Sequence, residues 1–227
     1  PYHDIPNFPE STVAGHSGNF IFGTLGGRRV IAMQGRFHYY EGYDMKTVTF
    51  PVRVFKALGV KTLFVSNAAG GMNKEFHVGD VMVITDHINL FPENPLRGKN
   101  HEELGPRFPA MTEPYDHRLV RLADTIAAET GLHLVHGVYV GTTGPTFETP
   151  AEYEYFRIIG GDAVGMSTVP EVIVAKHMSM EVFGISVITD LGGKDITEVP
   201  SHEEVQKAAI SAQPTVVALM KEMVARC

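Results

Sequence analysis

The stretch TLFVSNAAGG, residues 62–71, decides the fold. Its apolar start, residues 62–65, predicts a short buried strand, and the small residues at 66–71 predict a loop after it. In α/β proteins, ligands bind beyond the carboxyl ends of strands, which makes this loop a candidate binding element. Its backbone N–H groups could receive an anion, although the same residues are equally typical of a tight turn without a ligand.

Strands and helices alternate on both sides of this stretch. Upstream, strands at 19–25 and 29–34 flank the pair Gly26-Gly27, which is typical of a hairpin, and apolar spacing predicts a helix at 46–58. Downstream, we expect strands at 80–86, 135–141, 163–166 and 182–189, and helices at 116–130, 151–159, 171–180 and from near His202 to the C-terminus. This alternation predicts an α/β fold, a single domain over residues 1–227 with a central mixed, largely parallel twisted sheet flanked by helices.

Two segments carry no periodic pattern. Residues 89–114 are rich in Pro, Gly and charge, and loops of this length in compact domains are usually functional or mobile. Residues 190–200 contain Gly192-Gly193 and several charges, which predicts a flexible loop. Pro214 lies inside the last predicted helix, where we expect a bend.

Composition limits the classes of partner. The 227 residues are 44% hydrophobic and 20% charged, with a net charge of −7, and Lys and Arg occur singly, so a nucleic-acid partner is not expected. Cys227 is the single cysteine, which excludes a disulfide within the chain. We find no signal-like or membrane-spanning apolar stretch and expect a cytoplasmic protein. The chain opens on Pro1 rather than methionine, and we expect an N-terminal segment to be missing.

Several familiar chemistries have no motif here. The sequence contains no G-x-G-x-x-G opening a helix, no phosphate-binding G-x-x-x-x-G-K-[ST] and no G-x-S-x-G elbow. His133 and His136 are three residues apart in extended chain, so they face opposite sides and do not predict a metal site.

Arg36 and His38 follow the strand at 29–34 and, two residues apart, share one face of an extended chain. Arginine offers a fork of donors that suits phosphate, and histidine can add a donor. An anion site and a solvated strand end with aromatic filler explain this segment equally well.

Two further turns place polar groups near predicted strand ends. GPTFE, residues 144–148, delivers the Phe147 ring and the Glu148 carboxylate, either to a heterocycle or merely to a helix entry with an acid in its first turn. GMSTVPE, residues 165–171, opens a helix whose free N–H groups suit an anion, although Ser167 could serve only as an N-cap.

Taken together, these segments resemble the trimeric, low-molecular-mass purine nucleoside phosphorylases. The resemblance extends over almost the whole chain, and the order of its blocks makes it specific. The blocks are IPNFP (5–9), GHSG (15–18), MQGRFH (33–38), TFPVRVF (49–55), NAAGG (67–71), NPLRG (94–98), RFPAM (107–111), GPTFET (144–149), residues 164–174 and SHEEV (201–205).

The resemblance implies a reaction in which phosphate attacks C1′ of a purine ribo- or deoxyribonucleoside, reversibly giving the free base and ribose 1-phosphate. It implies no metal and no organic cofactor, with phosphate as co-substrate. Positive charge grows on the sugar and negative charge on the base in the transition state, so the enzyme would act by positioning and by preorganised electrostatics.

The resemblance also implies roles for single residues. Phosphate would be bound by Arg36, His38, the Ala68 amide and Ser167, with His16 nearby. The nucleoside would be bound by Tyr40, Met166 and His202 at the ribose, by Phe147, Glu148 and Asp190 at the purine, and by Phe108 from the neighbouring subunit of a homotrimer. His38, Glu148 and Asp190 are the expected catalytic residues.

Two departures from the family pattern matter. The family's Gly- and Ser-rich phosphate loop and its preceding strand would lie upstream of residue 5, and we expect them to be missing from this sequence. Asp190 stands where members acting on 6-oxopurines usually carry Asn, and a carboxylate facing O6 sets acceptor against acceptor. We favour inosine and guanosine as substrates; the alternatives are an adenosine or methylthioadenosine phosphorylase and a catalytically silent purine-binding protein.

Overall fold

The structure is a computed structural model that describes residues 1–13, 16–193 and 201–227, apart from the side chain of His202. Its centre is a sheet that closes on itself in the order β3-β6-β5-β4-β7. The strands are β3 (Thr62–Gly71), β4 (Val81–Asn89), β5 (Val135–Gly141), β6 (Ala163–Gly165) and β7 (Glu181–Leu191). The pairs β3–β7, β4–β5 and β5–β6 are parallel, whereas β3–β6 and β4–β7 are antiparallel. The predicted mixed, largely parallel sheet is confirmed. That the sheet closes on itself was not predicted from the sequence.

The loop predicted at 66–71 is wrong, because β3 continues as a strand to Gly71. Small residues serve close packing here rather than a turn. A Cβ at Gly71 would lie 2.9 Å from Ile188 Cγ2, and one at Gly70 would lie 2.9 Å from Tyr153 Oη. Likewise β7 extends to Leu191, so Asp190 is a strand residue, and residues 194–200 of the predicted flexible loop lie outside the described chain.

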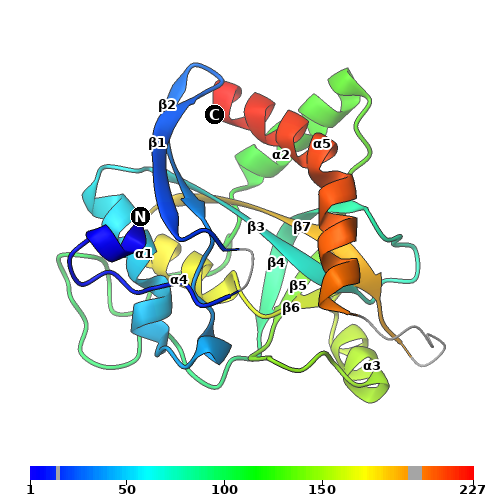
Figure 1. Cartoon of the computed structure of the whole chain (residues 1–227), viewed down its shortest axis with the longest axis horizontal. Coiled ribbons are helices and arrows are strands. Elements are labelled where there is room, and N and C mark those ends of the chain that lie inside the picture. The colour runs from blue at the N-terminus through cyan, green and yellow to red at the C-terminus, as the bar shows by residue number, and fades with distance from the viewer. Residues whose placement is uncertain (14–15, 194–200) are drawn as a thin grey trace.

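Two helix pairs pack against the sheet (Figure 1). Helices α1 (Met45–Ala57) and α4 (Val169–His177) share one apolar core with β3, β4 and β7, while α2 (His117–Thr130) and α5 (His202–Arg226) share another with β4 and β7. The predicted helices are confirmed to within two residues, except that α4 starts earlier and ends before Ser179, whose positive φ of 54° breaks the helix. Figure 1 shows α5 changing direction along its length, as expected from Pro214.

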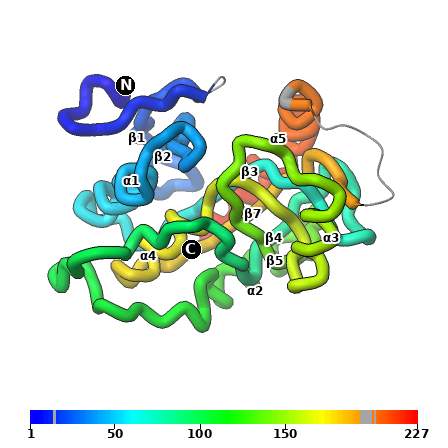
Figure 2. Tube along the Cα trace, turned by 90° about the horizontal axis from the view of Figure 1, so that it is seen from below, coloured from blue at the N-terminus to red at the C-terminus, as the bar shows by residue number. Residues whose placement is uncertain are grey.

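The predicted hairpin is confirmed as β1 (Asn19–Leu25) paired antiparallel with β2 (Arg28–Gln34). Gly26 packs so closely on the end of α5 that a Cβ there would lie 2.8 Å from Ala225 Cβ. Short 3₁₀ helices, η1 (Tyr2–Asp4) and η2 (Tyr39–Glu41), precede and follow the hairpin. The N-terminal segment lies with the hairpin and α1 on one side of the molecule, away from α3 (Pro150–Ile158) (Figure 2).

Residues 90–116 contain neither helix nor strand, as predicted, and pass along α4 (Figure 2). Asn100 ties this segment down: its Oδ1 lies 3.2 Å from His177 Nε2, and its Nδ2 donates to the Gly105 carbonyl at 3.1 Å. Gly105 allows no side chain, since a Cβ would fall 1.9 Å from the His177 carbonyl oxygen. None of the helices in the described part of the chain combines the length and apolarity needed to cross a membrane.

Candidate active site

A cavity of about 280 Å³ lies where β2, β3, β6 and β7 end. Segments far apart in the sequence line it, including the residue after β2, the strand β3 and the turn before α4. Most of the predicted site residues are brought together here: His16, Arg36, His38, Tyr40, Ala68, Phe147, Glu148, Met166, Ser167 and Asp190. The fold therefore gathers residues from distant parts of the chain into one candidate site.

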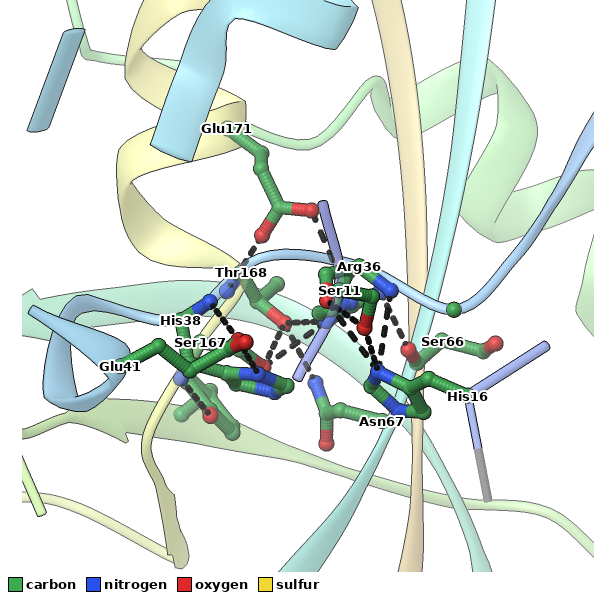
Figure 3. Close-up of polar contacts among 12 residues, drawn as sticks. Ser11, His16, Arg36, His38, Glu41, Ser66, Asn67, Ser167, Thr168 and Glu171 are labelled. Carbon is green, nitrogen blue, oxygen red and sulfur yellow. Dashed lines mark hydrogen bonds and ion pairs between the residues drawn. The ribbon is translucent and has the colours of Figure 1, made fainter. Parts of the chain in front are cut away.

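The Arg36 guanidinium lines the cavity beside Ser66 of β3, and several hydrogen bonds hold it there (Figure 3). Its Nη1 donates to Ser167 Oγ at 2.8 Å and to Thr168 Oγ1 at 3.1 Å, and its Nη2 donates to the Ser66 carbonyl at 2.7 Å. Glu171 Oε1 lies 3.7 Å from Nε in an ion pair that is largely shielded from solvent. These contacts fix a positive charge at this point of the cavity and leave few guanidinium hydrogens for a ligand.

His38 is an uncharged acceptor rather than the donor that we predicted. Burial and the nearby Arg36 charge lower its pKa to about 4, against the partial opposition of Glu41. Its Nδ1 lies 3.0 Å from Glu41 Oε1. Burial opposes the charge of Glu41, but hydrogen bonds from Thr12 and His38 outweigh it and lower its pKa, so Glu41 is a carboxylate that only accepts. Nδ1 must therefore carry the proton, which leaves Nε2 with a lone pair.

Two further rings stack on the His38 imidazole. The ring centroid of Tyr40 lies 4.7 Å from that of His38, and the ring centroid of His16 lies 5.4 Å from it. His16 Nδ1 lies 3.1 Å from the Arg36 carbonyl oxygen. Gly35 must be glycine for this contact, because its φ is 109° and a Cβ would lie 2.6 Å from His16 Cβ. The stack fixes the orientation of His38 toward the cavity.

The turn between β6 and α4 supplies Ser167 and a strained neighbour. Thr168, not Ser167, is the residue that precedes the first turn of α4, so the N-cap explanation for Ser167 is wrong. Thr168 has φ 73°, a conformation that β-branched residues rarely adopt. Its N–H donates to Glu171 Oε2 at 2.7 Å, and the Ser167 N–H donates to Tyr139 Oη at 3.3 Å. These bonds hold the turn in its unusual shape.

Two carboxyl groups, those of Glu148 and Asp190, line the cavity farther along β3, where Gly70 lies beside Asp190. Glu148 Oε1 accepts from Thr142 Oγ1 at 3.3 Å, and the oxygens of Asp190 accept from Thr189 Oγ1 at 2.9 Å and Tyr153 Oη at 3.2 Å. Burial raises the pKa of both carboxyls, and the charge of Asp190 adds to the shift at Glu148. Each group is thus more easily protonated than an exposed acid.

The helix-entry explanation for Glu148 is wrong, because α3 is capped by Thr149 and carries Glu152 in its first turn. Sequence reasoning missed Tyr153, an α3 residue that is only 5% exposed and donates to Asp190. It also missed Glu41 and Thr168, whose side chains orient His38 and Arg36. In the sequence, nothing distinguishes these residues from ordinary helix and turn residues.

Residues 1–225 match the protein family described as the phosphorylase superfamily. The chain belongs to this superfamily. Purine nucleoside phosphorylase 1 of Geobacillus stearothermophilus is 58% identical over 205 residues, 90% of this chain and 75% of that protein. The purine nucleoside phosphorylase of Rattus norvegicus is 54% identical over 218 residues, 93% of this chain and 75% of that protein. A Schistosoma purine nucleoside phosphorylase solved in complex with guanosine has a TM-score of 0.95 at 45% identity, covering 100% of this chain and 83% of that one.

In this member of the superfamily, Phe108 is not among the described residues that line the cavity. Phe108 lies in the 90–116 segment with 87% of its side chain exposed, 5.7 Å from the guanidinium carbon of Arg107. His202 opens α5, and its side chain is outside the described part of the chain. Their roles stay predictions.

Within the described residues, no three His, Cys, Asp or Glu side chains gather in a way that could hold a metal ion. His136 in β5 pairs with Asp124 at 2.8 Å. His133 precedes β5 and lies 4.0 Å from Asp80. The two histidines therefore pair with separate carboxylates, and because His133 lies outside β5, the alternation along one strand that we predicted does not apply to them.

Proposed function

We propose that this chain is a purine nucleoside phosphorylase of purine salvage, acting in the cytoplasm. Phosphate attacks C1′ of the nucleoside; the bond from C1′ to the purine nitrogen breaks, its electron pair leaves with the base, and a C1′–O–P bond forms. The observation that carries this proposal is a cavity lined by a fixed cation and by two partly buried carboxyl groups. The named relatives and the guanosine complex support the same reaction.

The Arg36 end is the phosphate end in this proposal. The fixed guanidinium charge attracts the anion, and the Ser167 hydroxyl and Ala68 amide donate to it. His38 accepts the remaining phosphate O–H at Nε2, which increases the negative charge that faces C1′. No metal or organic cofactor is required, because the positive charge comes from the chain and the nucleophile is phosphate itself. His16 and Tyr40 keep His38 in place.

The carboxyl end is the purine end. Glu148 accepts from the N1 edge of the base, and the half-exposed Phe147 ring packs on it. Met166 and His202 contact the ribose. Burial raises the pKa of Asp190, and in its protonated form this acid would donate to the O6 atom of a 6-oxopurine such as inosine or guanosine.

A second candidate, an adenosine or methylthioadenosine phosphorylase, is favoured by Asp190 in its ionised form. A carboxylate accepts well from a 6-amino group, and the hydrogen bonds from Thr189 and Tyr153 stabilise that charged form. Asp190 therefore decides between the two substrate classes.

A substrate panel tests the function directly. Base release from inosine, guanosine, adenosine and methylthioadenosine is measured with and without phosphate. We expect release that depends on phosphate and is fastest with inosine and guanosine. Preference for a 6-amino substrate would select the second candidate. Tight purine binding without phosphate-dependent release would overturn both and leave a silent binding protein.

A homotrimer with Phe108 in the neighbouring site is part of the proposal. The supporting observation is that this large apolar ring is 87% exposed on a segment that is tied to α4. Phe108→Ala should raise the KM for nucleoside and leave the KM for phosphate unchanged, whereas Leu104→Ala, at a half-exposed position of the same segment, should change neither. A monomer by sedimentation, or an unchanged nucleoside KM, would remove Phe108 from the site.

A further inference from the structure

We propose that Thr168 sets the direction of the hydrogen bonds at the phosphate end, so that Ser167 can only donate to the bound anion. Thr168 is then a positioning residue that acts through Ser167. This inference rests on the proposed function, in which Ser167 contacts phosphate. Figure 3 shows the residues that carry it: Arg36 after β2, Asn67 in β3, and Ser167 and Thr168 in the turn before α4.

The hydrogen-bond partners of Thr168 determine the direction in which its hydroxyl donates. Arg36 Nη1 and Asn67 Nδ2 lie 3.1 Å and 2.9 Å from Thr168 Oγ1, and both nitrogens can only donate. A hydroxyl oxygen has two lone pairs and one hydrogen, so these two donors fill its accepting capacity. The hydroxyl hydrogen must then go to an acceptor, and Ser167 Oγ lies 3.0 Å away.

The Thr168 hydroxyl in turn determines the direction in which Ser167 donates. Ser167 Oγ accepts from Arg36 Nη1 at 2.8 Å and, as just derived, from the Thr168 hydroxyl. Both of its lone pairs are occupied, so its own hydrogen is free for a third partner. Ser167 lines the cavity, whereas Thr168 is fully buried behind it. The hydrogen therefore points to the ligand, which must offer an acceptor oxygen.

The backbone of the turn is arranged for this purpose. Thr168 keeps a positive φ of 73°, which β-branched residues avoid, and strained residues of this kind cluster at functional sites. The strain turns Oγ1 toward Arg36 and Asn67, while Glu171 takes the Thr168 N–H. Asn67 Oδ1 is buried without a hydrogen-bond partner among the described residues. The Asn67 amide therefore donates to Thr168 through Nδ2, although its own oxygen accepts no hydrogen bond from the described residues.

The direction of these hydrogen bonds also determines which ligand fits. An anion whose oxygens accept from Ser167 is favoured, and a neutral group that presents an O–H at that point meets a second hydrogen. The specificity for phosphate at Ser167 then depends on two donors, Arg36 and Asn67. Asn67 acts on the ligand only through the Thr168 hydroxyl. Removing the Thr168 hydroxyl would leave the Ser167 hydrogen free to rotate away from the anion.

The test is a set of variants assayed for the KM of phosphate and of nucleoside. Thr168→Val should raise the phosphate KM by about 2- to 13-fold, the equivalent of one neutral hydrogen bond. The nucleoside KM should stay within about twofold of its value in the unmodified chain. Thr168→Ser keeps the hydroxyl and should restore most of the loss. In the double variant Ser167→Ala with Thr168→Val, the phosphate KM should match that of Ser167→Ala alone, because Thr168 acts through Ser167.

A second variant covers the case in which Thr168→Val fails to fold. Asn67→Asp places an acceptor on the Thr168 hydroxyl and should draw its hydrogen away from Ser167. The resulting rise in phosphate KM should disappear in the Ser167→Ala background, whereas simple charge repulsion would persist there. Additive effects in either cycle, or an unchanged phosphate KM in Thr168→Val, would overturn the inference. Absence of phosphate-dependent turnover in the unmodified chain would instead overturn the proposed function.

Discussion

Asp190→Asn is the substitution that most directly tests base recognition. The two oxygens of Asp190 accept from Thr189 Oγ1 at 2.9 Å and from Tyr153 Oη at 3.2 Å. An asparagine can keep the first bond through Oδ1 and donate through Nδ2 to the phenol oxygen. The phenol hydrogen can then turn to Glu148, which also interacts with Tyr153. We expect the fold to tolerate the change with little loss of stability.

The effect on substrate preference follows from donors and acceptors. An amide donates to O6 of a 6-oxopurine, where a carboxylate opposes it, and one mispaired buried polar contact costs about 1–3 kcal/mol. The ratio of kcat/KM for inosine over adenosine should therefore rise by about 5- to 150-fold. Losing the charge at 190 also lowers the pKa of Glu148, which keeps that group an acceptor for N1–H.

The assay is steady-state kinetics with both nucleosides at saturating phosphate. Asp124→Asn, the same chemical change on α2 outside the cavity, is the matched control and should leave the ratio unchanged. A ratio that moves less than twofold in Asp190→Asn, or that moves toward adenosine, would refute this account of Asp190.

Two further predictions concern stability and the packing of the purine end. Burial lowers the pKa of His38 and His87 from 6.5 to about 4, so between these pH values the unfolded chain binds more protons than the folded chain. The free energy of unfolding must therefore fall as pH decreases, by about 3 kcal/mol per histidine over the whole interval. Urea unfolding at pH 7 and pH 5 measures this fall, and a urea midpoint that does not depend on pH would contradict it. Gly70→Ala places a Cβ 3.0 Å from Asp190 Oδ2 and should raise the nucleoside KM but not the phosphate KM, whereas Gly23→Ala, with open space around it, should change neither; equal kinetics of the two variants would argue against a tight purine end.

Local sequence signals were sufficient where one segment determines its own shape. The glycine pair at 26–27 predicts the hairpin, and apolar spacing predicts α1. The continuation of β3 through 66–71 was not predictable, because small residues are typical of turns and only the close approach of Ile188 and Tyr153 shows why they form a strand. The closure of the sheet depends on the antiparallel pairing of β4 with β7, which are about a hundred residues apart in the chain and have no local pattern that records it.

The same distinction holds for the candidate site. Arg36 and His38 could be proposed from their position after a strand, because side-chain chemistry and strand ends are both visible in the sequence. Tyr153 and Thr168 could not, because their importance lies in contacts with Asp190 and Arg36 that only the folded chain brings about. Glu41 changes the chemistry of His38 itself, from the expected donor to an acceptor.

That change in His38 makes a prediction about which anions the cavity accepts. Hydrogen phosphate carries acceptor oxygens for Ser167 and one O–H for the Nε2 lone pair of His38, whereas sulfate has no hydrogen and sets oxygen against nitrogen. At pH 7.5 we expect the inhibition constant of sulfate to exceed the phosphate KM by about 10- to 150-fold, the equivalent of one charge-assisted hydrogen bond. A bound anion raises the low pKa of His38, so the difference should shrink at pH 5.5 as the ring takes up a proton and becomes a donor. Sulfate that competes equally well at both pH values would show that His38 donates to the anion, and that Glu41 does not determine its tautomer.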